Sequence, residues 1–211
     1  MIFNNRYDAA MRLVPLLKKY ADTKGVVLAI PRGAIPMGFY IAKELHLPLD
    51  LLLTKKIGHP QNPELAVGSV SMEGRVVDPR FNMDEDFIDR ETVRIRATLK
   101  DRYKKFMGNR SSIDLKDKTV IIVDDGIATG NTMLLSVDLV KHHAPEKVVV
   151  ATPVAAPEAL RKLRKKADEV ICLYAPEDFR AVGEFYDDFS QVTDDEVIDF
   201  LNRLSTEQKS V

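Results

Sequence analysis

The sequence predicts an α/β fold with a mainly parallel central sheet and helices on both of its faces. Five short apolar runs, rich in β-branched residues, lie at residues 26–30, 49–53, 119–123, 147–151 and 169–173. Strands that are apolar throughout are typical of a sheet that is covered on both faces. Helical patterns lie between most of these runs, as expected of a parallel sheet. The chain of 211 residues is long enough for one such domain with a large core.

Composition excludes several classes of function. The chain has 31 Lys and Arg against 32 Asp and Glu, so its net charge gives no support to nucleic acid or a membrane surface as a partner. Its apolar runs are shorter than the ~20 residues that a membrane span needs. The charged N-terminus, with Arg6, Asp8 and Arg12, is unlike a signal peptide. Cys172, the only cysteine, indicates a buried thiol in a reducing cytoplasm.

The helices are predicted from apolar spacing. Residues 5–20 form an amphipathic pattern that Pro15 should interrupt or kink. Further patterns cover residues 35–45, 84–107, 133–142, 157–166 and 193–205. In the last of these, Thr193 and Glu196 have the spacing of a capping box.

Two segments stand outside this alternation. Residues 57–80 contain prolines, glycines and two short apolar runs, which predict a hairpin or a mobile flap ahead of the long helix 84–107. After that helix, Arg110 is a candidate phosphate ligand on a loop near the flap. Within residues 174–190, four aromatic side chains lie among acids in a stretch of eleven residues, which predicts either a lid over the site or rings packed on the sheet edge.

Residues 120–132, with the sequence VIIVDDGIATGNT, carry the strongest functional signal. Asp124 and Asp125 end a buried strand, and a loop between Gly126 and Gly130 then leads into a helix. Free backbone N–H groups at a helix N-terminus bind phosphate, whereas carboxylates repel phosphate and accept hydrogen bonds from sugar hydroxyls. The pattern therefore predicts a ligand with a ribose and a phosphate. The alternative is a turn and a capped helix that bind nothing.

Two other strand ends converge on the same edge, because ligands of parallel sheets bind at the carboxyl ends of strands. Arg32 and Gly33 follow the first strand, and Lys55 and Lys56 follow the second. Arg32 can donate two hydrogen bonds to a phosphate group. Without a ligand, Gly33 would be a requirement of the turn alone and the two lysines would be solvated charges.

Residues 120–132 resemble the PRPP-binding signature of the type I phosphoribosyltransferases, where PRPP is 5-phosphoribosyl 1-pyrophosphate. Residues 29–38 resemble the pyrophosphate loop of the same family, which often contains a non-proline cis peptide. The resemblance implies a single domain over residues 1–211, with a flexible flap at about 57–80, an inserted helix at about 84–107 and a hood from about 174–190. It also implies a homodimer, for which the inserted helix offers a contact.

The resemblance also implies a role for each candidate residue. Asp124 and Asp125 would hold the ribose, while Arg32, Gly33, Lys55 and Lys56 would hold pyrophosphate. The 5′-phosphate would bind the loop formed by Gly126, Ile127, Ala128, Thr129, Gly130, Asn131 and Thr132. Mg²⁺ would arrive with PRPP, so no metal site built by the protein is expected. In the hood, Phe179 and Val182 would contact the acceptor. Glu64 is the candidate acid of the flap, unless it caps a turn or is solvated.

The implied activity is displacement of pyrophosphate from PRPP by a nitrogen nucleophile, expected to be a nucleobase, in nucleotide metabolism. Hypoxanthine-guanine enzymes carry an Asp at the position of Ala128, so 6-oxopurines should be poor acceptors here. The Ala128–Gly130 string is similar to adenine enzymes. The alternative is a regulatory protein that senses PRPP or a nucleotide. A ribose-phosphate pyrophosphokinase would need a second, similar domain.

Overall fold

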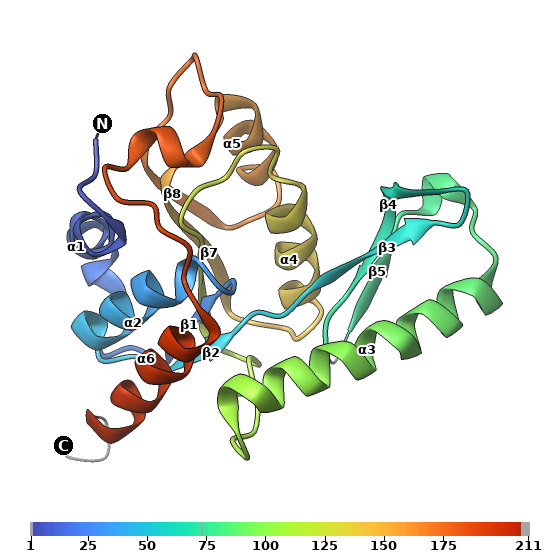
Figure 1. Cartoon of the computed structure of the whole chain (residues 1–211), viewed down its shortest axis with the longest axis horizontal. Helices are drawn as coiled ribbons and strands as arrows, with labels where there is room; N and C mark the ends of the chain where they lie inside the picture. The colour runs from blue at the N-terminus through green and yellow to red at the C-terminus, as the bar shows by residue number, and fades with distance from the viewer. Residues whose placement is uncertain (1, 73, 208–211) are drawn as a thin grey trace.

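A five-stranded parallel sheet forms the centre of the computed structural model, which describes residues 2–72 and 74–207 (Figure 1). The strand order is β2-β1-β6-β7-β8, and the predicted fold class is confirmed. The strands are β1 (Gly25–Ala29), β2 (Leu49–Leu51), β6 (Thr119–Val123), β7 (Lys147–Val154) and β8 (Glu169–Tyr174). Ala29 pairs with Val123, which pairs with Ala151, so the carboxyl ends of β1 and β6 lie level at one edge.

Alternate residues of the central strands point into two separate apolar clusters. Ile121 and Val123 belong to the cluster of α1 (Arg6–Leu17) and α2 (Ala34–Leu45). Val120 and Ile122 belong to the cluster of α4 (Asn131–Lys141) and α5 (Pro157–Leu163). Helices therefore cover both faces, which is why the strands are apolar throughout. The C-terminal helix α6 (Asp194–Glu207) packs against α2 and the long helix α3 (Glu85–Met107).

Pro15 lies inside α1 and does not interrupt it, which corrects one of the two predicted outcomes, an interruption or a kink. The helix runs through Pro15 to Leu17 and continues as a 3-10 turn, Lys18–Tyr20. Leu13 and Leu17, on either side of the proline, are fully buried. Tertiary packing of this apolar face supplies most of the stability of such a helix, which outweighs the loss of one backbone hydrogen bond.

The segment after β2 forms an arm that projects from the main body (Figure 1). Its antiparallel sheet contains β3 (Lys55–His59), β4 (Asn62–Val70) and β5 (Arg75–Val77) in that order, and α3 packs along it. The predicted hairpin is therefore present, but β3 lies outside the strands that the sequence predicts. The two lysines at the start of β3 made that strand look like a polar loop.

Residues 175–193 connect β8 to α6 and contain one short 3-10 helix, η3 (Val182–Phe185). Tyr186 is fully buried and packs against Phe3, so one ring of the predicted lid belongs to the core. Thr193 and Glu196 form the predicted capping box, in which Glu196 Oε2 accepts from Thr193 N at 2.7 Å. No helix within residues 2–72 and 74–207 is long and apolar enough to cross a membrane.

Cys172 is only half-buried, which corrects the prediction of a core thiol. It lies on β8, the edge strand of the sheet, where one side of the strand has no neighbour. Its thiol donates to the carbonyl oxygen of Tyr174 at 3.1 Å, and burial raises its pKa above the ordinary value.

Candidate functional site

The acid pair, Asp124 and Asp125, directly follows β6, the middle strand of the central sheet. Asp124 Oδ1 accepts a hydrogen bond from the backbone N–H of Asp125 at 3.0 Å. Asp125 Oδ2 accepts a hydrogen bond from Nε of Arg6, at the start of α1, at 2.8 Å. Both carboxylates are therefore held in place, one by local backbone and the other by a side chain from the far end of the sequence.

Burial controls the charge of the acid pair. Each residue retains a small exposed surface, yet protein surrounds most of each carboxyl group. Burial raises the pKa of Asp124 well above its ordinary value, and the neighbouring charge of Asp125 raises it further. Burial also raises the pKa of Asp125, but the guanidinium of Arg6 opposes that shift. Arg6 therefore favours the ionised form of Asp125.

The loop from Gly126 to Gly130 presents a helix N-terminus at the same strand end. Ile127 anchors it, because its buried side chain packs in the core and its N–H donates to the carbonyl oxygen of Val154 at 2.9 Å. Gly130 has a φ of +77°, which favours glycine, and precedes the first residue of α4. The exposed residues around this turn are Ala128, Thr129, Asn131 and Thr132. Their arrangement leaves the first N–H groups of α4 at the surface, where an anion can bind.

The turn after β1 touches the acid pair. The peptide bond between Pro31 and Arg32 is cis, as the family resemblance implies. A Cβ atom on Gly33 would lie 2.1 Å from Oδ2 of Asp125, so only glycine fits here with the carboxylate in this position. Arg32 Nη1 donates to Oδ1 of Asp194 at 3.2 Å, and Lys105 Nζ donates to Oδ2 of the same carboxylate at 2.6 Å. The structure thus places Gly33 against the acid pair and joins the Arg32 guanidinium to α6.

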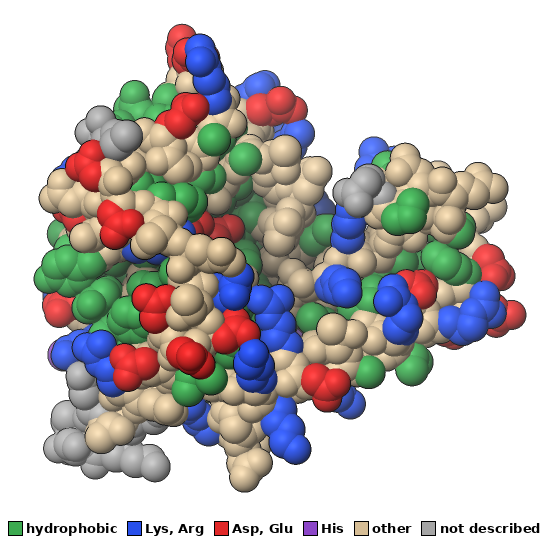
Figure 2. Space-filling model, in the orientation of Figure 1, with side chains coloured by type: hydrophobic (Ala, Val, Ile, Leu, Met, Phe, Trp, Pro, Cys, Tyr) green, Lys and Arg blue, Asp and Glu red, His purple; other side chains and the backbone are tan. Residues whose placement is uncertain are grey.

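The two candidate lysines lie on the arm rather than on the main body. Lys55 and Lys56 are exposed at the start of β3, where they pair with Val70 and Ser69 of β4. The pKa of Glu91 on α3 is lowered by a hydrogen bond from Arg94 and, more weakly, by the charge of Lys55. Figure 2 shows a hollow between the main body and the arm, with Lys and Arg side chains at its rim.

Glu64 and Arg110 are the two remaining candidate site residues outside the hood. Glu64 belongs to β4, but its side chain lies outside the described residues. Arg110 is not a free loop residue, which corrects the prediction of a phosphate ligand. Its guanidinium donates to the carbonyl oxygens of Met107 and Leu201, each at 3.0 Å, and so ties the end of α3 to α6.

The hood lies directly on the loop of the acid pair. A Cβ atom on Gly126 would lie 2.2 Å from Cγ1 of Val182, so the two segments are in close contact. Phe179 stacks on Phe185 with ring centroids 5.5 Å apart. Tyr186 donates from its hydroxyl to the carbonyl oxygen of Asp125 at 2.6 Å. Sequence reasoning missed Tyr186 and Arg6 as neighbours of Asp125, because no local pattern links positions so far apart in the chain.

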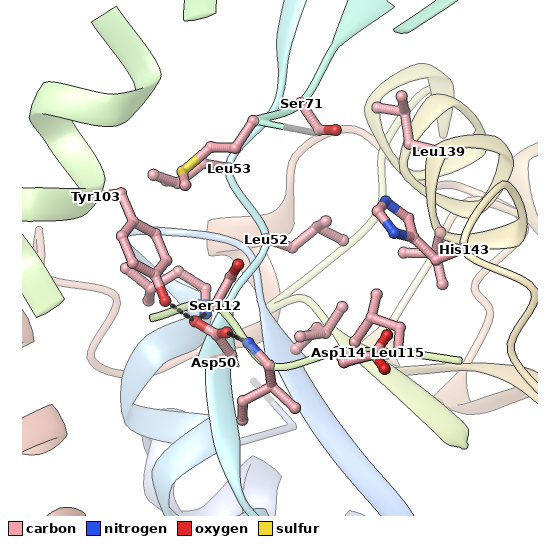
Figure 3. Close-up of a pocket in the computed structure, with 15 residues that line it drawn as sticks. Asp50, Leu52, Leu53, Ser71, Tyr103, Ser112, Asp114, Leu115, Leu139 and His143 are labelled. Carbon is pink, nitrogen blue, oxygen red and sulfur yellow. Dashed lines mark hydrogen bonds between the residues drawn. The ribbon is translucent and has the colours of Figure 1, made fainter. Parts of the chain in front are cut away.

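A separate pocket of about 260 Å³ lies away from the acid pair (Figure 3). Its lining includes Asp50, Tyr103 and His143, and none of the residues of the loop 126–130. The buried carboxylate of Asp50 already accepts hydrogen bonds from the Tyr103 hydroxyl at 2.9 Å and from Ile113 N at 2.8 Å. The buried carboxylate of this pocket is therefore already satisfied, and the groups suited to a phosphorylated sugar lie at the sheet edge instead.

Within the described part of the chain, His, Cys, Asp and Glu residues form no group of three or more that could hold a metal ion. Mg²⁺ usually binds through substrate oxygens and water, so a phosphorylated ligand could carry it to this edge of the sheet.

The chain is similar to known proteins along nearly all of its length. A family model described as "Phosphoribosyl transferase domain" matches residues 4–190. A Mycobacterium tuberculosis protein, named provisionally as a phosphoribosyl transferase, is 37% identical over 207 residues, covering 96% of this chain and 47% of that protein. The chain thus spans about half the length of the curated relatives it matches. The crystal structure of TT1426 from Thermus thermophilus has 37% identity and a TM-score of 0.88, covering 97% of this chain and 99% of that one.

Proposed function

Because the chain belongs to the phosphoribosyl transferase domain family, we propose that it transfers the 5-phosphoribosyl group of PRPP to a nitrogen nucleophile and releases pyrophosphate. One observation carries this proposal. The acid pair, the Gly33 turn and the N-terminus of α4 meet at one edge of the sheet. Hydrogen-bond acceptors for a sugar thus lie beside donors for a phosphate, which is the chemistry that a phosphorylated ribose requires.

In the proposed reaction, a bond forms between the acceptor nitrogen and the anomeric carbon. The bond from that carbon to the pyrophosphate oxygen breaks, pyrophosphate keeps the electron pair, and the acceptor loses a proton. Positive charge develops on the ribose in the transition state. Asp124 and Asp125 would bind the ribose hydroxyls beside this charge, so the main tasks of the protein are positioning, charge placement and exclusion of water.

The anionic groups of PRPP would occupy both sides of the acid pair. The N–H groups and hydroxyls between Gly126 and Thr132 would bind the 5′-phosphate. Arg32, Gly33, Lys55 and Lys56 would bind pyrophosphate with its Mg²⁺, which neutralises charge on the leaving group. This assignment requires the arm and the main body to contact the same ligand, because the lysines belong to β3 and Arg32 follows β1.

We propose a nucleobase as the acceptor, bound under the hood near Phe179 and Val182. The stack of Phe179 on Phe185 offers aromatic surface for a planar base. Ala128 has no group that can move a proton, so acid–base catalysis must come from elsewhere, and Glu64 of the arm is the first candidate. On this proposal, 6-oxopurines are poor acceptors, and Glu64→Gln slows transfer to the preferred acceptor.

We also propose a homodimer formed through α3, where Val93 is 71% exposed.

The decisive experiment measures pyrophosphate release from PRPP and Mg²⁺ with a panel of nucleobases and amines, alongside calorimetric titration of PRPP. Release that depends on one acceptor supports the enzyme. Binding of PRPP without release for any acceptor would instead favour a regulatory protein that senses PRPP. Absence of binding for PRPP and for nucleoside monophosphates at millimolar concentration overturns the assignment of the site.

A further inference from the structure

Arg6 connects three parts of the molecule that are distant in sequence. Its Nε donates to Oδ2 of Asp125 at 2.8 Å, and its Nη1 donates to the carbonyl oxygen of Ser190 at 2.8 Å. The guanidinium plane lies over the ring of Phe189, with its central carbon 4.0 Å from the ring centroid. Only 11% of the Arg6 side chain is exposed, so this is a packed, specific contact rather than a surface ion pair.

The contact determines which oxygens of the acid pair remain for a ligand. Oδ2 of Asp125 accepts from Arg6, and Oδ1 of Asp124 accepts from the backbone N–H of Asp125. The backbone N–H of Asp125 also lies near the Asp125 carboxyl and lowers its pKa. Oδ1 of Asp125 and Oδ2 of Asp124 keep lone pairs that can accept from two neighbouring hydroxyls of a ribose.

The hood is joined to the same aspartate at a second point. Tyr186 donates to the backbone carbonyl oxygen of Asp125 at 2.6 Å, and its ring lies against Phe189, with centroids 4.9 Å apart. Phe189 is also the ring under Arg6 and packs against Gly183 of η3. Arg6, Tyr186 and Phe189 thus hold both the side chain and the backbone of Asp125 relative to the hood.

We propose that Arg6 is a positioning residue, which fixes the carboxylate of Asp125 with one oxygen free for a ribose hydroxyl and ties the hood to the acid pair. The inference rests on the proposed function, because it assigns Arg6 to the ribose half of that site. Arg6 need not touch the ligand. Its effect is that the carboxylate is already oriented when the sugar arrives, and the nearby guanidinium favours the ionised form of that carboxylate.

The test compares ribose 5-phosphate with 2-deoxyribose and 3-deoxyribose 5-phosphate, measured by calorimetry on the full chain. All three sugars carry the same charge, so a general change in electrostatics alters their affinities equally. The preference for ribose over either deoxy sugar reports only on contacts to the hydroxyls. In Arg6→Met we expect this preference to fall about tenfold, the lower end of the effect of losing a hydrogen bond to a charged group.

Two matched variants keep the result interpretable. Arg12→Met alters an arginine of the same helix that pairs with Asp8 and lies over Phe3, and it should leave the preference unchanged. Arg6→Lys keeps the positive charge but cannot reproduce the planar fork, so we expect an intermediate loss of preference. Arg6→Lys also provides the measurement if Arg6→Met does not fold.

A double variant tests whether Arg6 changes the preference for ribose through the carboxylate of Asp125. If Arg6 acts through Asp125, then adding Arg6→Met to Asp125→Asn should change the preference less than twofold, because the two residues act as one unit. An unchanged preference in both Arg6 variants overturns the inference while leaving the proposed function intact. Failure of the wild type to bind ribose 5-phosphate overturns the proposed function, and the inference with it.

Discussion

The two halves of the proposed site are built in different ways. In the ribose half, Asp124 and Asp125 follow one strand, and the Asp125 side chain is 14% exposed. In the pyrophosphate half, Arg32 follows β1 with a side chain 32% exposed, while Lys55 and Lys56 lie exposed on the arm. The carboxylates are held by hydrogen bonds within the main body, whereas the cations come from two parts of the molecule.

The carboxylates of the ribose half are preorganised, whereas the cations of the pyrophosphate half have to be brought together. In the ribose half, hydrogen bonds from Arg6 and from the Asp125 backbone hold the two acids, and burial opposes their ionisation. In the proposed pyrophosphate half, the full set of cations would surround a single anion only if that anion contacted both the arm and the main body. Variants in the ribose half should therefore have large effects on affinity and stability, and variants in the pyrophosphate half should have smaller ones that depend on salt.

Asp125→Asn should produce the largest effect. The substitution keeps the size of the side chain but removes the charged acceptor, and a hydrogen bond to a charged group is worth roughly 10- to 150-fold in affinity. We expect PRPP affinity, measured by calorimetry, to fall within that range while the circular dichroism spectrum is retained. Asp178→Asn, in an exposed part of the hood, is the control. A lower melting temperature with unchanged PRPP affinity would show that Asp125 is structural only.

Asp124→Asn should stabilise the protein while weakening ligand binding. Burial raises the pKa of Asp124 in the folded protein, so ionisation of Asp124 lowers the free energy of unfolding. This cost is absent at pH values below the pKa of Asp124 in the unfolded chain, and it is complete above the pKa in the folded protein. Asn retains the oxygen that accepts from Asp125 N. The gain in melting temperature over the wild type should therefore increase as pH rises from about 4. Each 1 kcal/mol of ionisation cost that the substitution removes should raise the melting temperature by about 2–4 °C in a domain of this size. A gain that is equal at all pH values contradicts the assignment.

The same contrast explains how much could be predicted from the sequence. The acid pair and the loop up to Thr132 lie within one continuous stretch, so strand, turn and helix signals could be combined locally. In α3, the helical spacing of five apolar residues predicts one shared buried face, and all five are buried: Ile88, Ile95, Leu99, Tyr103 and Phe106. Arg6 lies 119 residues from Asp125, and the Asp194 carboxylate lies 162 residues from Arg32. Such contacts depend on tertiary packing, for which a single sequence carries no periodic or local signal.

Lys55→Met should have a smaller, salt-dependent effect. Lys55 is exposed, and pairs of exposed charges contribute roughly two- to fivefold in an equilibrium constant. We expect pyrophosphate affinity to fall by that factor at low salt, with a smaller difference at high salt because ions screen exposed charges. Ribose 5-phosphate affinity should change less than pyrophosphate affinity. Equal losses for both ligands would contradict a specific contact between Lys55 and pyrophosphate.

Asp194→Asn should give an effect of the same size as Lys55→Met, but in the opposite direction. The Asp194 carboxylate bridges Arg32 and Lys105, with donor–acceptor distances of 3.2 and 2.6 Å. Pyrophosphate bound to Arg32 must therefore replace this carboxylate or share the guanidinium with it. Removing the charge should raise pyrophosphate affinity about two- to fivefold, the range expected for a partly exposed ion pair.

Asp195→Asn is the matched control for that last variant, because Asp195 is the next residue in the first turn of α6 and is exposed. Both substitutions remove a negative charge close to the helix N-terminus and should reduce helix stability to a similar extent. Only Asp194→Asn should also release Arg32. If pyrophosphate affinity instead falls in Asp194→Asn and not in Asp195→Asn, Asp194 orients Arg32 for the ligand rather than competing with it. The pyrophosphate half would then be preorganised as well, and the contrast between the two halves would disappear.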